Sequence, residues 1–363
     1  MVTNLPAKAK AIWAKAMSSK EPRDKLELLR QFYSSFPKHK STEKLEMQIK
    51  RQIKGLEEEI KRKKKKHGTI VNIWSIRKSE ELQIAVIGKL DDAIQFFSKV
   101  TKKEMEPFAV YTKPTVGASK SDSIVFQVVL CPFDPIMSDE KQKKFGGLLY
   151  NADFLIVMLP SKEFIEYFSV LINWLTQYNI VLTLRKKEAR IEQTGTGGLR
   201  IAGKSRFCTE EEIRQFLFEY KIVNAIVKIS EETTLEDIEA TLFGQISRPA
   251  IVLCINNEQE RQMNLNFKNL PTGSLTIDKH ELLDRILKIL SLIKIYTRSH
   301  SKGIAEKPIL IRRKATVIDV AEIIHKDLAK NFLYAKLLRN DNEIKVGRYF
   351  VLDDNDVIEI RSR

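Results

Sequence analysis

Apolar residues along most of the chain form short runs that alternate with amphipathic segments. Five runs have the length of a buried strand, at residues 82–87, 124–130, 153–159, 180–184 and 250–255. Segments with helical spacing lie between and after them, at residues 164–177, 237–243 and 279–295. Strands that alternate with helices predict an α/β fold in which helices cover an open, mostly parallel sheet.

The first 67 residues have a different pattern, with helical character over residues 5–66. One stripe of apolar residues begins near Pro22. A break at Phe36-Pro37 separates it from another in the segment 44–66. In that last segment the apolar residues recur at intervals of three or four, at Leu45, Ile49, Ile53, Leu56 and Ile60. This spacing predicts two helices that form a helical hairpin over residues 1–67.

Two further units follow from the pattern. Residues 188–247 contain a glycine-rich loop at 195–198, a strand at 225–229, and helices that begin after Thr209 and Thr234. This pattern predicts an α/β insertion within the sheet domain 68–305. Residues 306–363 have strands at 309–312 and 357–360 around a helix at 317–327, a β-grasp pattern. The polar stretch 299–303 lacks periodicity and predicts a linker before this last domain.

Positive charge is concentrated near the N-terminus. Residues 1–67 hold 19 Lys and Arg against 8 Asp and Glu, whereas the other 296 residues hold 43 against 39. Such a segment favours an acidic partner, of which nucleic acid is the most common, although lysine-rich helices are also simply soluble. Three cysteines without CxxC spacing exclude a zinc site or disulfide framework, and no membrane span or signal peptide is expected. A cytoplasmic protein fits these features best.

The C-terminal residues resemble a TGS domain, a β-grasp module found in threonyl-tRNA synthetases and certain GTPases. The resemblance is carried by an ordered series of short matches rather than by one motif. The matching stretches are residues 313–321 (RKATVIDVA), 325–328 (HKDL), 331–336 (NFLYAK), 346–347 (VG) and 352–360 (LDDNDVIEI). This resemblance implies a compact β-grasp fold for the last domain.

The rest of the chain resembles the DRG branch of the Obg GTPases. The best matches are residues 218–225 (FEYKIVNA) and 234–237 (TLED), which look like the insertion that interrupts the G domain in that branch. The helical N-terminus is also similar. The resemblance implies a P-loop-GTPase-like sheet whose family ligands are GTP and Mg²⁺, and a protein partner of the DFRP kind.

The phosphate-binding motif of that family is degenerate in this chain. A P-loop has the form GxxxxGK[ST], in which backbone N–H groups surround phosphate, Lys neutralises it and Ser/Thr holds magnesium. Gly88 stands at the first position, but Ala93, Ile94 and Gln95 replace the second Gly, the Lys and the Ser/Thr. Asp91 and Asp92 add negative charge where a triphosphate would lie, which is unfavourable.

The remaining nucleotide signatures are lost as well. Leu130 falls where the DxxG aspartate belongs, and Gln259 replaces the carboxylate that reads guanine, although Asn256 of that motif is retained. Thr112 matches the switch threonine, but an ordinary loop Thr explains it equally. The combined losses predict that GTPase activity is absent and that no cofactor is bound.

Two clusters of basic residues are candidates for RNA binding. The first is the run Lys61, Arg62, Lys63, Lys64, Lys65 and Lys66, whose ammonium and guanidinium groups suit a phosphate backbone. The second, in the C-terminal domain, consists of Arg312, Arg313, Lys314 and Lys326. A solvated helix end and a solvated domain surface are the alternatives.

The sequence therefore favours a non-catalytic, GTPase-like TGS protein that binds ribosomal or other structured RNA in translation. Two alternatives stay open. One is a GTP-binding protein or hydrolase with a non-standard nucleotide site, and the other is an adaptor that pairs with a true GTPase.

Overall fold

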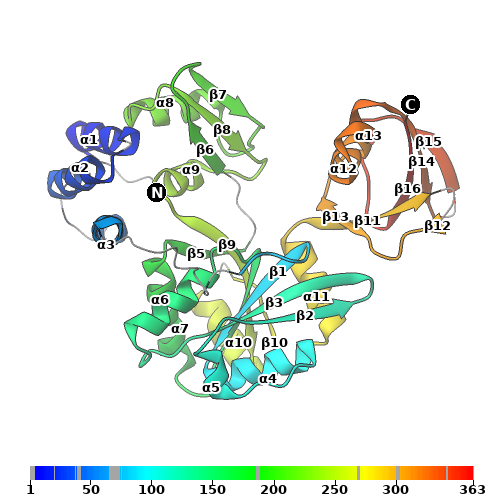
Figure 1. Cartoon of the computed structure of the whole chain (residues 1–363), viewed down its shortest axis with the longest axis horizontal. Helices are drawn as coiled ribbons and strands as arrows, with labels where there is room; N and C mark the ends of the chain where they lie inside the picture. Colours follow the sequence, from blue (N-terminus) through cyan, green and yellow to red (C-terminus); the bar gives the residue numbers. More distant parts are fainter. Residues whose placement is uncertain are drawn as a thin grey trace. The chain divides into compact units, whose positions relative to one another are not determined.

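The computed structural model describes residues 5–19, 21–36, 38, 42–64, 74, 76–184, 189–267, 270–299, 303–340 and 342–362. The chain divides into two compact units. One comprises Met1–Asn72 and Ser169–Ser247, and the other comprises Ile73–Phe168 and Arg248–Arg363. The α/β class predicted from the sequence is confirmed (Figure 1).

A mostly parallel sheet forms the centre of the second unit, with strands in the order β10-β9-β4-β1-β3-β2. Only the β2–β3 pair in this path is antiparallel. The strands are β1 (Leu82–Gly88), β2 (Thr115–Ser121), β3 (Ile124–Pro132), β4 (Phe154–Met158), β9 (Ile246–Cys254) and β10 (Thr272–Ser274). Every residue of β1 and β4 is buried, as expected for strands that helices cover on both faces.

The helices that accompany this sheet follow the strands along the chain. They are α4 (Leu90–Thr101), α5 (Pro107–Val110), α6 (Asp139–Leu148), α7 (Phe164–Gln177), α10 (Asn257–Asn266) and α11 (Lys279–Ile289). Acidic residues in the first turns of α4 and α6 are favourable there, because the helix N-terminus carries partial positive charge.

The C-terminal sheet has the order β12-β11-β16-β14-β15, and β13 also pairs with β11. Its elements are β11 (Leu292–Ser299), β12 (Gly303–Ile304), β13 (Ile309–Arg312), α12 (Val317–Ile324), α13 (Lys326–Lys330), β14 (Phe332–Arg339), β15 (Asn342–Val346) and β16 (Asp356–Ser362). Buried residues of α12 pack on this sheet, which gives the predicted β-grasp arrangement.

One expectation for this region is wrong. The helix expected over 279–295 ends at Ile289, and Leu292–Ser299 instead forms β11, which precedes the boundary expected at residue 306. Of the linker expected at 299–303, Ser299 pairs with Gly303, whereas residues 300–302 lie outside the described residues. Apolar residues at 286, 290 and 293 fit a helix as well as the true strand, which explains the error.

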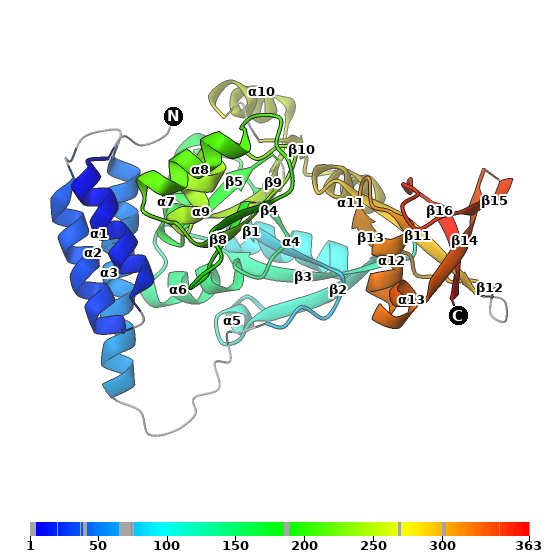
Figure 2. The same cartoon turned by 90° about the horizontal axis from the view of Figure 1, so that it is seen from above.

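The first unit has one shared hydrophobic core. Three helices, α1 (Ala7–Ser18), α2 (Pro22–Ser35) and α3 (Glu43–Lys64), lie side by side (Figure 2). The predicted hairpin therefore has a third helix, α1. Trp13 of α1 contacts Phe32 of α2 and Phe243 of the insertion, with ring centroids 5.1 and 4.9 Å apart. Helices and insertion thus bury the same apolar cluster.

The insertion contains a three-stranded sheet in the order β6-β8-β7. Its elements are β6 (Ala189–Gln193), β7 (Leu199–Ala202), α8 (Glu210–Glu219), β8 (Ala225–Ile229) and α9 (Leu235–Leu242), and the short β5 (Ile180–Thr183) precedes them. Both helices begin with a capping box, Thr209 with Glu212 and Thr234 with Asp237, which confirms the helix starts read from the sequence.

The packing of α4 on the central sheet gives a stability prediction. A methyl group at Gly117 of β2 would lie 2.7 Å from Thr101 and 2.9 Å from Phe97, whereas Gly147 of α6 has no atom within 4 Å of such a group. We expect Gly117→Ala to lower the free energy of unfolding by about 1–3 kcal/mol through overpacking. Gly147→Ala should raise it by about 0.5–1 kcal/mol, because Ala is a better helix former. Denaturant titration measures both, and equal stabilities would contradict this packing.

Candidate functional site

The carboxyl ends of β1, β3, β4 and β9 form the edge at which parallel α/β sheets bind ligands. Helix α4 follows β1, α7 follows β4 and α10 follows β9. The degenerate nucleotide positions lie on these strands or on the helices that follow them, except Thr112 and Asn256, the N-cap of α10.

The connection between β1 and α4 is a single residue. β1 ends at Gly88, Lys89 caps the helix and α4 begins at Leu90. Ala93 N–H already donates to Lys89 O at 2.9 Å, and Ala93 is fully buried. The positions that a P-loop would place around a phosphate are therefore the first two turns of a helix, with Ile94 and Gln95 along it. No loop of backbone N–H groups remains to surround an anion.

Gly88 has a packing role in this arrangement. Its carbonyl accepts from Phe133 N–H at 2.8 Å, and a Cβ on it would lie 3.0 Å from Met158 Cβ of the neighbouring strand β4. The glycine therefore allows close approach of β1 and β4, which accounts for it without a phosphate.

Aromatic and acidic side chains gather next to this junction. The Tyr167 hydroxyl donates to Phe133 O at 3.1 Å, and their ring centroids are 5.8 Å apart. Burial raises the pKa of Tyr167, and the carboxylates of Asp134 and Asp92 raise it further. Burial, Asp134 and Asp91 likewise raise the pKa of Tyr111. Three carboxylates in one place disfavour a triphosphate.

The position of the magnesium-binding aspartate lies inside the sheet. Leu130 is fully buried in β3 and pairs with Val86 of β1. Thr112, the switch threonine in the resemblance, donates its hydroxyl to Ala109 O at 2.8 Å and closes a turn after α5. In the described part of the chain, no group of three or more His, Cys, Asp or Glu side chains is arranged to hold a metal.

The position of guanine recognition is used for internal hydrogen bonds. Asn256 caps α10 by accepting from Gln259 N–H at 2.9 Å. Gln259 is 2% exposed; its Oε1 accepts from Ile255 N–H and its Nε2 donates to Pro160 O, both at 2.9 Å. These bonds tie the loop after β9 to the loop after β4. The residues present therefore do not fit Mg²⁺-GTP at the phosphate, magnesium or base positions.

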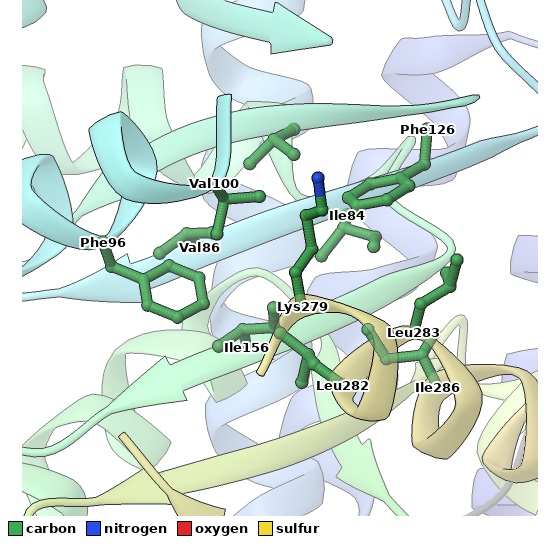
Figure 3. Close-up of a pocket in the computed structure, with 11 residues that line it drawn as sticks. Ile84, Val86, Phe96, Val100, Phe126, Ile156, Lys279, Leu282, Leu283 and Ile286 are labelled. Carbon is green, nitrogen blue, oxygen red and sulfur yellow. The ribbon is translucent and has the colours of Figure 1, made fainter. Parts of the chain in front are cut away.

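An apolar slot on one face of the sheet is also too small for a nucleotide. Figure 3 shows its lining residues, which come in part from α4 and α11. Its volume is about 10 Å³. Ten of its lining residues are apolar, and Lys279 lies over it at the start of α11. We interpret this slot as a packing gap of about one water molecule.

A Ser-His-Asp group near the start of α11 lacks the geometry of a catalytic triad. His280 Nδ1 lies 3.0 Å from Ser121 Oγ and 2.9 Å from Asp122 Oδ1. A triad needs the serine and the carboxylate on different ring nitrogens, so that the imidazole can take a proton while the carboxylate orients it. Both contacts here use one nitrogen, and we assign the group to joining α11 to the β2–β3 hairpin.

A charged cleft lies where α11 meets the C-terminal sheet. Its volume is about 300 Å³, and its lining residues are Asp284, Leu287, Lys288, Ser291, Leu292, Ile293, Lys294, Arg313 and Asp354. Asp354 accepts from Lys294 N–H at 2.7 Å, and Arg313 N–H donates to Ser291 O at 2.8 Å. Within the described residues, Lys288, Lys294 and Arg313 have no ion pair, and with Asp284 and Asp354 in the same lining the cleft has a net positive charge.

The structure therefore separates the basic candidates of the C-terminal domain. Arg313 lines the cleft, whereas Arg312 and Lys314 take part in interactions of their own and Lys326 is exposed at the start of α13. Lys288 and Lys294 were missed from the sequence, because a helix expected through residue 295 would have spread them over its surface.

The basic run lies at the end of α3. Lys61, Arg62, Lys63 and Lys64 belong to the helix, but their side chains lie outside the described part of the structure. Lys65 and Lys66 are outside the described residues altogether. None of the described helices combines the length and apolarity that crossing a membrane requires.

Comparison with known proteins identifies two regions of similarity. Residues 293–362 match the TGS domain. The chain is 28% identical over 228 residues to a GTP-binding protein of Methanocaldococcus jannaschii, an alignment that covers 58% of each chain. It is 24% identical over 227 residues to developmentally regulated GTP-binding protein 1 of Xenopus laevis, covering 58% of this chain and 61% of that protein. The chain thus spans about three fifths of the relatives it matches.

Among solved structures, the YchF GTPase of Schizosaccharomyces pombe aligns with 78% of this chain and 99% of its own, at 12% identity and a TM-score of 0.45. In sequence, the chain is thus similar to GTP-binding proteins of the developmentally regulated type, and its residues 293–362 match the TGS domain.

The buried hydrogen bonds of Gln259 give a second stability prediction. We expect Gln259→Ala to lower the free energy of unfolding by about 1–3 kcal/mol, because buried N–H and C=O groups lose their partners. Gln262→Ala, three residues along α10, removes only an exposed contact to Glu258 and should cost less than about 0.5 kcal/mol. Denaturant titration of both variants tests this, and a neutral Gln259→Ala would show that the loops are joined by other contacts.

Proposed function

We propose that this TGS-domain relative of the developmentally regulated GTP-binding proteins neither binds nor hydrolyses GTP, and that it binds ribosomal or other structured RNA. The single residue between β1 and α4 carries the first half of the proposal. A non-standard nucleotide site would still need a loop that surrounds the triphosphate, and this junction offers only the first N–H groups of α4, beside the carboxylates of Asp91 and Asp92.

The RNA half of the proposal is supported by the charged cleft. Lys288, Lys294 and Arg313 have no ion pair among the described residues, and a phosphate group would neutralise them. The basic run 61–66 adds positive charge in the same chain. The relatives' names describe GTP binding, so RNA binding rests on this chain's own residues.

The first prediction from this proposal concerns GTP. We expect calorimetry with Mg²⁺ and GTP to give no binding at micromolar concentrations, because phosphate, magnesium and base contacts are all missing. The variant Ala93→Gly, Ile94→Lys, Gln95→Ser should not restore binding, since it changes residues in α4 and does not create a loop. A micromolar, magnesium-dependent dissociation constant for the wild type would contradict the proposal.

The second prediction concerns the salt dependence of RNA binding. We expect the triple variant Lys288→Gln, Lys294→Gln, Arg313→Gln to bind an RNA hairpin more weakly in fluorescence anisotropy. The slope of log K against log salt should become shallower by about 2–3, since each duplex phosphate contact contributes about 0.9.

A charge-matched variant provides the control. Lys99→Gln, Lys162→Gln, Arg261→Gln removes three exposed cations from the same unit and should leave the slope nearly unchanged. A third variant replaces residues 61–66 with glutamine. We expect its slope of log K against log salt to be shallower by roughly the contribution of three phosphate contacts. If the wild type binds no RNA, the proposal fails, and an RNA-independent protein partner becomes the better explanation.

A further inference from the structure

Among the described residues of the first unit, the helices that pack on the three-stranded sheet of the insertion lie on one of its faces. Along its strands, alternate residues point into the core of the first unit: Ala189, Ile191, Leu199, Ile201, Ala225, Val227 and Ile229 all pack there. Helices α8 and α9 contribute to the same core and so lie on that side. The other face consists of the intervening residues of these three strands, β6, β8 and β7.

The residues on this open face carry net positive charge. Strand pairing places Arg190 beside Lys228 in one row, and Glu192, Ile226 and Arg200 together in the next. All four charged side chains are exposed. Glu192 accepts from Lys228 at 3.2 Å, which neutralises that pair. Arg190 and Arg200 have no ion pair among the described residues.

The spacing of the two arginines suits an extended polyanion. They lie on the strands that flank β8 and differ by one row, so their Cα atoms are about 12 Å apart from standard strand spacing and rise. That distance covers more than one phosphate of a nucleic acid strand. A guanidinium also binds phosphate with two parallel hydrogen bonds, which favours Arg over Lys for this contact.

The glycine-rich loop between β6 and β7 leaves the end of this face open. No atom lies within 4 Å of a Cβ built on Gly195 or Gly198, and the nearest atoms to one on Gly197 belong to the Arg200 guanidinium, at 3.5 Å and beyond. Gly197 and Gly198 have positive φ, and Asn224 fixes the turn by accepting from Gly198 N–H at 2.8 Å. A backbone without side chains allows a bulky ligand to approach closely.

We propose that this open sheet face, with Arg190 and Arg200 as its anchors, binds the phosphate backbone of RNA. The inference rests on the proposed function and adds to it a second RNA contact, in the insertion. The face has six positions, two on each of β6, β8 and β7, and none of them carries an aromatic ring. It therefore contacts phosphates and not bases. Binding through it is therefore independent of RNA sequence.

The test uses the full-length protein and a fluorescent single-stranded RNA, with anisotropy measured across a salt series. We expect Arg190→Gln, Arg200→Gln to weaken binding several-fold and to make the slope of log K against log salt shallower by about 1.4, at about 0.7 per contact. Arg190→Lys, Arg200→Lys keeps both charges and should retain most of the slope. Circular dichroism confirms that the exposed substitutions leave the fold intact.

The control is a charge-matched double variant, Lys99→Gln, Arg261→Gln. It distinguishes RNA binding by the protein from RNA binding by this sheet face. If the wild type binds RNA and the sheet variant matches this control in affinity and slope, the sheet face is excluded while the proposed function stands. If the wild type binds neither this RNA nor the RNA hairpin under any salt condition, the proposed function fails and this inference fails with it. If it binds the hairpin but not this single-stranded RNA, the inference alone fails.

Discussion

The chain passes from the central strand β1 into α4 through Lys89 alone, and this junction constrains everything around it. Because the helix begins at once, its first turn fills the place of a phosphate loop and buries Ala93 against the sheet. Gly88 then serves the contact between β1 and β4. Asp91 and Asp92 stabilise the helix start, a favourable role for carboxylates at the N-terminus of a helix and an unfavourable one beside a triphosphate.

Positive charge is displayed elsewhere. In the second unit the cleft beside α11 presents Lys288, Lys294 and Arg313, and in the first unit the open sheet presents Arg190 and Arg200. Lys294 is partly buried and the other four side chains are exposed. Under the proposed function these groups would bind phosphate mainly by charge, so their affinity would depend on ionic strength more than on RNA sequence.

Local patterns predicted most elements because their signals are local. Residues 164–177 and 225–229 were bounded correctly from apolar spacing, and two capping boxes marked helix starts. The strands β2, β6, β7, β10, β11, β12, β14 and β15 were not predicted, because a strand is defined by partners distant in sequence. The degenerate nucleotide positions were identified individually. That α4 begins at Leu90 was not foreseen, since the family resemblance suggested a loop there.

The turn closed by Thr112 has a consequence for timing. In GTPases that act as switches, the γ-phosphate orders a loop and hydrolysis releases it, so the rate of hydrolysis sets how long a partner stays bound. Here the Thr112 hydroxyl is already satisfied by Ala109 O, and the loops after β4 and β9 are joined through Gln259. A ligand shifts an equilibrium only by binding two states differently. Under the proposed function no nucleotide step controls partner binding, so its extent depends on the concentrations of the protein and of its partner.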